Sequence, residues 1–334
     1  MLKLSSKIEL YNGNSDTLKY TFTFVNEIEI VSTWDSLTDT CKVTIPRNIN
    51  FKDKQLKEVF KKGDKVKIYL GYDENYVLRF NGFILKIDLT LPIVLHLEDF
   101  SYLLKKNKLT KKSYSSVDTK TLLKNIVGDV VDYVITSNQT LGQFIIQDGV
   151  TTSEVLKYLE ENHKIYSWFR DGVLYVGLAY YNSVSSKHYF DVNNNVIENN
   201  LVYNDLEDIQ IKIKAISVNQ EIIGGKSKEK KITVYYPNEL TDGSVRTYNG
   251  SMNISESDLL KEAKAYYESL RFDGYTGSFT SFGAPAVNHG DIVNFKNNEI
   301  PEQNQSEYLV KSVTTTFGVG GYRNIIELGG LVNG

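Results

Sequence analysis

Apolar and polar residues alternate in short runs along the first hundred positions of this chain. Runs such as KIELYNG, DTCKVTIPRN, DKVKIYLGY and PIVLHLEDF place apolar side chains at every second position, the period of a strand with one buried face. Turn-forming pairs such as Asn12-Gly13 and Asn81-Gly82 separate the runs. Several short strands at this spacing predict a sandwich or barrel, so residues 1–104 are predicted to form a first β-barrel domain.

From residue 105 the hydrophobic period lengthens to that of amphipathic helices. In SVDTKTLLKNIVGDV, Asp118 is a predicted N-cap, and in GVTTSEVLKYLEENHK, Thr151 and Glu154 have the spacing of a capping box. The run KIYSWFRDGVLYVGLA predicts a hairpin that turns at its Asp-Gly pair. Residues 105–200 are therefore predicted to form an α/β domain with two helices and a hairpin.

The remaining third of the chain returns to strands, with one helix between them. An Asn-rich stretch at residues 193–200 predicts a loop, and SESDLLKEAKAYYESLRF predicts a helix capped by Ser255. We predict a discontinuous second β-barrel domain from residues 201–236 and 281–334, with a small helix-containing domain at 237–280. The predicted class is mainly β with α/β insertions (α+β): two similar antiparallel β-barrel domains plus two small α/β domains.

The motif Gly-Asp-x-Val occurs late in each predicted β-domain, at Gly63-Asp64 and at Gly290-Asp291. Each copy leads into a strand, a polar turn and a second strand. Glycine permits positive φ, and aspartate can hydrogen-bond its own backbone two residues on, so we interpret both pairs as structural barrel turns. No period of about 20–50 residues accompanies the motif, so it indicates a duplicated domain and not a solenoid.

Composition and charge add one local feature. The chain is 41% hydrophobic and 24% charged, and its 23 Tyr and 15 Phe favour strands. A net charge of −3 gives no bulk argument for a nucleic-acid partner. The run LLKKNKLTKK is basic, and we interpret it either as a solvated linker or as a surface that faces a lumen or a partner. Its lysines are Lys105, Lys106, Lys108, Lys111 and Lys112.

The sequence carries no recognisable catalytic, cofactor or metal signature. The four histidines (His96, His163, His188 and His289) lack the spacing of a zinc site, and no nucleophile elbow or phosphate-binding loop occurs. The glycine-rich FGVGGYRN lies between alternating strands, which predicts a hairpin turn. Cys41 is the single cysteine and is predicted to be a small buried hydrophobe. We therefore expect no enzymatic activity, no cofactor and no bound metal.

The opening residues, MLKLSSKIELYNG, lack the apolar segment of a secretory signal. No run of about 18 apolar residues is present, so no membrane insertion is expected. We expect the chain to be made in a reducing cytoplasm and to stay soluble there.

Two stretches carry a resemblance to a known family. They are KKGDKVKIYLGY with RFNGFILKID in the first half, and the run from LLKEAKAYYESLRF through NHGDIVNF to EYLVKSVTTTFGVGGYRNIIEL at the end. In this order they resemble the baseplate hub proteins of contractile-tailed phages, the tail protein D family, which is related to the hub half of type VI secretion spike proteins. The resemblance implies two barrels and two α/β domains per chain, and a homotrimer whose six barrels form a ring of pseudo-six-fold symmetry.

The same resemblance implies a function and a set of partners. The protein is expected to be a late virion structural protein of the tail baseplate, assembled in the host bacterial cytoplasm. It is expected to join the tail tube protein to the central spike protein around a channel, and to contact tape-measure and baseplate wedge proteins, with DNA only as passing cargo. Because the chain ends at Gly334 directly after the last predicted strands, spike or lytic activity is expected on a separate protein.

Two alternatives come from other classes. A carbohydrate-binding, Tyr-rich β-protein of a tail or cell surface would use aromatic stacking, although Trp34 and Trp168 are the only tryptophans. A glycan hydrolase would need two carboxylates placed several ångströms apart in space, and nothing in the sequence indicates them.

Overall fold

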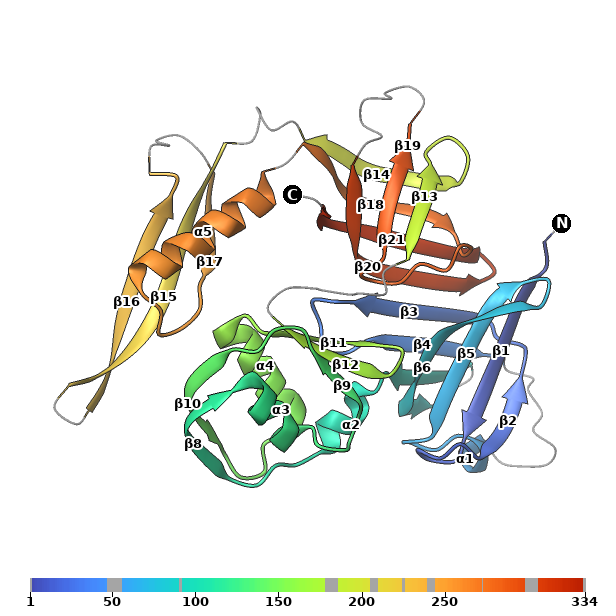
Figure 1. Cartoon of the computed structure of the whole chain (residues 1–334). Coiled ribbons are helices and arrows are strands. Elements are labelled where there is room, and N and C mark those ends of the chain that lie inside the picture. The colour runs from blue at the N-terminus through green and yellow to red at the C-terminus, as the bar shows by residue number, and fades with distance from the viewer. Residues whose placement is uncertain are drawn as a thin grey trace.

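A computed structural model describes most of the chain, and its strands dominate (Figure 1). The described residues are 2–46, 56–89, 92–177, 186–204, 210–223, 226–238, 244–271, 273–297 and 306–332. The mainly-β, α+β class predicted from the sequence is confirmed, and most strand pairs are antiparallel. The exact layout of two barrels and two small α/β domains stays a prediction.

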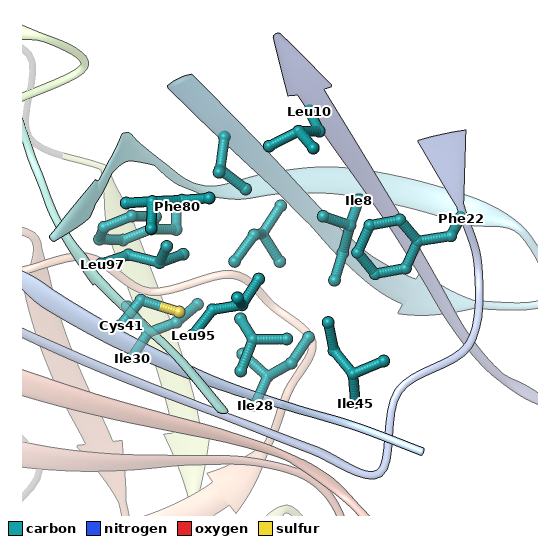
Figure 2. Packing of buried hydrophobic residues seen from close by; sticks show 14 of the residues in the cluster. Ile8, Leu10, Phe22, Ile28, Ile30, Cys41, Ile45, Phe80, Leu95 and Leu97 are labelled. Carbon is teal, nitrogen blue, oxygen red and sulfur yellow. The ribbon is translucent and has the colours of Figure 1, made fainter. Parts of the chain in front are cut away.

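The strands of the first hundred residues form one antiparallel arrangement. They are β1 (Leu4–Tyr11), β2 (Leu18–Phe22), β3 (Glu27–Thr33), β4 (Thr40–Ile45), β5 (Lys65–Tyr72), β6 (Asn75–Asp88) and β7 (Ile93–Glu98). They pair in the order β3-β4-β7-β6-β5-β1-β2. Their alternating apolar residues point to one side and make a packed cluster that includes Ile8, Ile28 and the buried Cys41 (Figure 2).

A short helix, α1 (Leu56–Val59), closes one end of this cluster. Val59 and Phe60 are buried in the cluster.

The α/β unit follows β7 and has its own hydrophobic cluster. Its elements are α2 (Ser101–Lys106), β8 (Lys112–Asp118), α3 (Thr119–Ile126), β9 (Tyr133–Ile135), β10 (Thr140–Ile146), α4 (Thr152–His163), β11 (Tyr166–Arg170) and β12 (Val173–Gly177). The predicted caps are present: Asp118 accepts a hydrogen bond from the Thr121 N–H, and Thr151 and Glu154 form a capping box. The predicted hairpin is present as β11 and β12.

A second arrangement comes from the end of the chain. Its strands are β13 (Lys187–Asp191), β14 (Val196–Asn204), β18 (Gly274–Phe282), β19 (Ile292–Lys296), β20 (Glu307–Gly318) and β21 (Gly321–Leu331). It is antiparallel except that β13 pairs with β19 in parallel. Their inward residues make a third hydrophobic cluster in which aromatic rings pack edge to face, for example Phe279 against Phe295. The glycine-rich stretch around Gly320 is the β20–β21 hairpin turn, as predicted.

The fourth cluster belongs to a three-stranded sheet covered by one helix (Figure 1). The sheet contains β15 (Ile211–Ile223), β16 (Lys226–Tyr236) and β17 (Ser244–Asn249), and the helix is α5 (Glu256–Leu270). Ser255 caps α5, as predicted. The inward Ile213 and Ala215 of β15 pack against Leu259 and Ala263 of α5.

Strand pairing differs from the predicted boundaries in three places. β15 pairs with both β16 and β17, and this sheet packs against α5, so among the described residues neither β15 nor β16 pairs with a strand of the second β-arrangement. Residues 274–280 belong to β18 of the large sheet instead of the helix-containing unit. The stretch at 193–200 is a loop only at its start, because β14 begins at Val196 and pairs with β18. Alternation predicts that a segment is a strand but does not specify its partner.

The two β-arrangements share one sheet. Residues Ser312–Gly318 of β20 pair antiparallel with Glu27–Thr33 of β3, and within the described ranges the resulting sheet has 13 strands. Phe317 and Tyr322, at the tip of the β20–β21 hairpin, are buried in the first cluster. The two halves are therefore joined by backbone hydrogen bonds and by a common core. None of the described helices is long and apolar enough to cross a membrane.

Candidate assembly site at the repeated turns and the junction

The Gly63-Asp64 turn is defined by three backbone hydrogen bonds. The Gly63 N–H donates to the Ile84 carbonyl at 2.8 Å, and the Ile84 N–H donates to the Asp64 carbonyl at 3.0 Å. The Asp64 N–H donates to the Lys61 carbonyl at 3.2 Å. Gly63 has a φ of +86°, so glycine is required here, because an L side chain in this region is strained.

The Gly290-Asp291 turn repeats the same three bonds. The Gly290 N–H donates to the Val310 carbonyl at 2.7 Å, and the Val310 N–H donates to the Asp291 carbonyl at 2.8 Å. The Asp291 N–H donates to the Asn288 carbonyl at 3.2 Å, and Gly290 has a φ of +78°. The two turns are therefore equivalent in backbone conformation and in the strand that each one holds.

The equivalence extends over five strands. The first arrangement contains the order β3-β4-β7-β6-β5, and the second contains β14-β18-β21-β20-β19, with every neighbouring pair antiparallel. In both, the second strand after the turn has a register shift at the same place, between Ile84 and Lys86 in β6 and between Val310 and Ser312 in β20. A shared bulge at a shared position is a specific structural feature of a duplicated sheet.

The carboxylates of the two turns bind different partners. In neither turn is the observed partner the backbone N–H two residues further on, which the sequence led us to expect. The buried Asp64 carboxylate accepts hydrogen bonds from the Gly13 N–H at 2.9 Å and from the Lys19 ammonium at 2.6 Å. These bonds attach the turn to the segment before β2 and to β2 itself. Asp64 therefore anchors the turn to the edge of its own sheet.

Asp291 makes a larger set of contacts and is fully buried. Its carboxylate accepts hydrogen bonds from Arg170 Nη2 at 2.9 Å, from His188 Nε2 at 3.0 Å and from the Asn288 N–H at 2.9 Å. Burial by itself raises the pKa of this carboxyl, but the bonds from His188 and Asn288 and the charge of Arg170 outweigh burial, so the pKa lies below its usual value. Asp291 thus attaches the β11–β12 hairpin to the second half of the chain.

His289 directly precedes this turn, and it lies where the second half, the β11–β12 hairpin and the first half of the chain meet. Its Nε2 is 3.1 Å from the Phe169 carbonyl of the hairpin and 3.9 Å from the Asp39 carboxylate of the first half. Burial lowers the pKa of His289 to about 4, so the imidazole is neutral at pH 7. Burial raises the pKa of the Asp39 carboxyl and of the Asp99 carboxyl. The charge of Asp99 also raises the pKa of Asp39. A cavity of about 150 Å³ adjoins these side chains.

Two further contacts cross directly between the halves. Arg79 Nη2 of β6 donates to the Val287 carbonyl at 2.8 Å and to Thr315 Oγ1 at 3.0 Å. The Tyr72 hydroxyl donates to the Tyr322 carbonyl at 3.1 Å. Together with the β20·β3 pairing, these bonds hold the two copies of the sheet in one relative position.

The predicted basic run is exposed but is not one uniform patch. Lys105 forms an ion pair with Glu98 at 2.9 Å, and Lys106 contacts the Tyr102 hydroxyl and ring. Lys112 donates to Asn125 Oδ1 at 2.8 Å. Lys108 and Lys111 are exposed as well. The run therefore contains two lysines held by α2 and its surroundings and three that lie further along the chain toward β8.

No described group of side chains has the arrangement of a metal site. His96 is paired with Asp88 at 2.8 Å, and His163 is the last residue of α4. Trp168 is buried and stacks on Tyr175, so it offers no exposed face for sugar stacking. Trp34 packs edge to face against Tyr166.

The fold of this chain is similar to that of phage tail proteins. No protein-family model and no curated protein matches the sequence. The tail protein from Neisseria meningitidis MC58 superposes with a TM-score of 0.67 at 14% identity, covering 98% of this chain and 96% of that one. The 43 kDa tail protein of prophage MuSo2 from Shewanella oneidensis gives 0.65 at 12% identity, covering 97% and 98%.

A third similar structure comes from a secretion system. The c3393 protein of E. coli is a component of the type VI secretion system with structural similarity to the T4 bacteriophage tail proteins gp27 and gp5. It matches with a TM-score of 0.56 at 9% identity, covering 97% of this chain and 76% of that chain. The resemblance stated from the sequence is therefore confirmed at the level of the fold.

Several residues of this site were not predicted from the sequence. Arg79, Asp39 and Asp99 carry no local signal, because each gains its role from contacts with distant segments. Arg170 lies beside the predicted Asp-Gly turn, but its partner Asp291 is 121 positions away. His289 has no predicted role in the sequence, whereas in the structure its side chain reaches across the junction to Phe169.

Proposed function

We propose that this chain is the structural hub of a contractile-tail baseplate. In this role three copies form a ring that joins the tail tube to the central spike and surrounds the channel. The single observation that carries the proposal is the duplicated five-stranded sheet, joined edge to edge through β20 and β3. A chain with two equivalent sheets converts a trimer into six similar positions, which matches a six-fold tube on one side and a three-fold spike on the other.

The contacts at the junction support a rigid hub. Asp291, Arg170 and His188 form a buried charged group that links the hairpin to the second half. Arg79 and the shared core fix the two sheets to each other. A part that connects two assemblies of different symmetry has to hold its own geometry, and these contacts provide it.

The proposal places the protein in the virion tail, where the similar phage proteins belong, with tube, spike, tape-measure and wedge proteins as partners and DNA as passing cargo. It assigns no catalytic step to the chain. An obligate ring interface of this kind buries on the order of 2,000–5,000 Å². The carbohydrate-binding alternative has no support from the buried Trp168.

Multi-angle light scattering of the purified protein over a range of concentrations tests the proposal. Three chains of 38.0 kDa give about 114 kDa. A particle of this mass supports the hub, and a monomer at every concentration contradicts it.

A further inference from the structure

A second pocket, separate from the junction, lies between the first half of the chain and the α/β unit. Its volume is about 330 Å³. Pockets that bind small molecules have volumes of about 300–1,000 Å³. It is lined by the segment between β3 and β4, by Lys105 of α2, by one face of α4 and by Ser167 of β11. Segments that are distant in the sequence therefore enclose a space large enough for a small molecule.

Glu160 of α4 lines this pocket with a carboxylate that has no cation in contact with it. Among the described residues this carboxylate forms neither an ion pair nor a hydrogen bond. Burial, followed by the charge of Asp35, raises the pKa of Glu160, and the charges of Lys157 and Lys164 do not offset this increase. A partly buried carboxylate beside a second carboxylate is stabilised when a cation binds between them.

The other charged side chains of the lining are held by partners of their own. Lys105 is paired with Glu98 at 2.9 Å, and Lys157 is paired with Glu161 at 3.7 Å. Glu154 is held in the capping box at the start of α4. The two remaining carboxylates of the lining are therefore the ones that face an occupant.

Asp35 is the more exposed of these two carboxylates, with 42% of its side chain in solvent. It accepts a hydrogen bond from Thr33 Oγ1 at 2.6 Å and lies 3.5 Å from the ammonium group of Lys311. The two oxygens of a carboxylate have several lone-pair sites, so Asp35 can accept a further hydrogen bond.

Ser167 gives an independent indication that a partner is missing from the pocket. Ser167 lines the pocket and is only 5% exposed, and its Oγ has no hydrogen-bond partner. Buried polar groups are normally hydrogen-bonded, and an unpaired one is destabilising. Leu37 and Leu156 add apolar wall to the same pocket. The lining therefore matches an occupant with a charged donor group at one end and a hydrocarbon part.

We propose that this pocket binds a small aliphatic amine. Its ammonium group donates hydrogen bonds to Glu160, Asp35 and Ser167 Oγ, and its hydrocarbon chain packs against Leu37 and Leu156. An alkylammonium group carries enough N–H donors for all of these acceptors. The pocket lies within one chain, so the inference goes beyond the hub proposal and does not depend on the number of copies in the particle.

Other classes of occupant fit these residues less well. A divalent cation such as Ca²⁺ takes about six to eight oxygen ligands, and the described residues contain no group of side chains that could hold a metal ion. An anion would be repelled by the carboxylates of Asp35 and Glu160. A neutral apolar molecule would leave Glu160 without a counter-charge and Ser167 without a hydrogen bond.

Titration calorimetry of the whole chain with 1,4-diaminobutane at low ionic strength tests the proposal. Butane-1,4-diol has the same hydrocarbon chain without the charge, and ammonium chloride has the charge without the chain. We expect saturable binding of one diamine per chain. The diol and the ammonium ion are each expected to bind at least about tenfold more weakly.

Three variants locate the binding. Glu160→Gln keeps the shape of the side chain and removes its charge, and it is expected to weaken diamine binding by at least about tenfold. Ser167→Ala is expected to weaken it by about two- to tenfold. Asp129→Asn removes an exposed carboxylate of the same α/β unit and is expected to bind like the unaltered chain. Circular dichroism and urea unfolding check that each variant is folded.

Three results would overturn the proposal. The first is no saturable binding of the diamine at millimolar concentration. The second is equal binding of the diol, because the pocket would then recognise the hydrocarbon chain alone. The third is unchanged binding in Glu160→Gln, because the amine would then bind elsewhere on the chain. None of these results bears on the hub, which light scattering tests separately.

Discussion

Asp64 and Asp291 occupy equivalent turns with the same backbone bonds, yet their carboxylates hold different things. Asp64 binds Lys19, whose side chain keeps 16% of its surface in solvent, and one backbone N–H. Asp291 binds Arg170 and His188, each 11% exposed, at the meeting point of the hairpin and the second half. The two turns therefore share one backbone conformation, whereas the aspartate side chain holds a different neighbouring segment in each copy.

The largest expected effect separates these two roles. Asp291→Ala leaves Arg170 without its buried counter-charge, and we expect a loss of about 3–5 kcal/mol in the free energy of unfolding. Asp64→Ala is expected to cost about 1–3 kcal/mol, because Lys19 can reach water. Urea unfolding of both variants, with the exposed Asp129→Ala as control, measures the difference. Equal losses at the two positions would contradict the comparison.

The effect of intermediate size is on the pH dependence of the free energy of unfolding, and it is expected at the second turn only. His289 has its pKa lowered to about 4 by burial, so between pH 4 and 6.5 the unfolded chain binds a proton that the folded chain does not. This term makes stability rise with pH and is worth about 2 kcal/mol between pH 5 and 7. The raised pKa values of Asp39 and Asp99 act in the opposite direction over part of this range.

A comparison of variants isolates the histidine from the carboxyls. His289→Gln is expected to lose less stability than the unaltered chain when the pH is lowered from 7 to 5, by about 2 kcal/mol. Denaturant unfolding at the two pH values measures this. An unchanged pH dependence in the variant would show that His289 does not remain neutral in the folded protein.

The smallest expected effect is at the basic run. Reversal of Lys108, Lys111 and Lys112 to Glu is expected to change the free energy of unfolding by less than about 0.5 kcal/mol and to leave the trimer intact. If these residues face the channel, passage of DNA or tape-measure protein in assembled particles is impaired. Lys105→Glu is the contrasting variant, since Lys105 pairs with the buried Glu98. Loss of the trimer in the triple variant would contradict the lumen interpretation.

The sequence predicted much of the local structure. Caps at Asp118, Thr151 and Ser255 are chemical signals confined to one turn of chain, and all three are observed. The repeated Gly-Asp motif indicated a duplication because it needs positive φ at the same point of each sheet. Such features depend on neighbours a few residues away, which a single sequence displays.

Long-range partners could not be predicted in the same way. β15 and β16 alternate as β20 does, but they pack against α5, because their inward residues fit that helix. The contacts of Arg79 with Val287 and of Arg170 with Asp291 join segments that are 208 and 121 residues apart. The β20·β3 junction likewise joins strands from the two ends of the chain, and alternation carries no information about which strands pair.

The most direct test of the hub account is the mass of the unaltered protein in solution by light scattering. The account predicts about 114 kDa, three chains of 38.0 kDa, stable on dilution. A mass of 38.0 kDa at every concentration would contradict it.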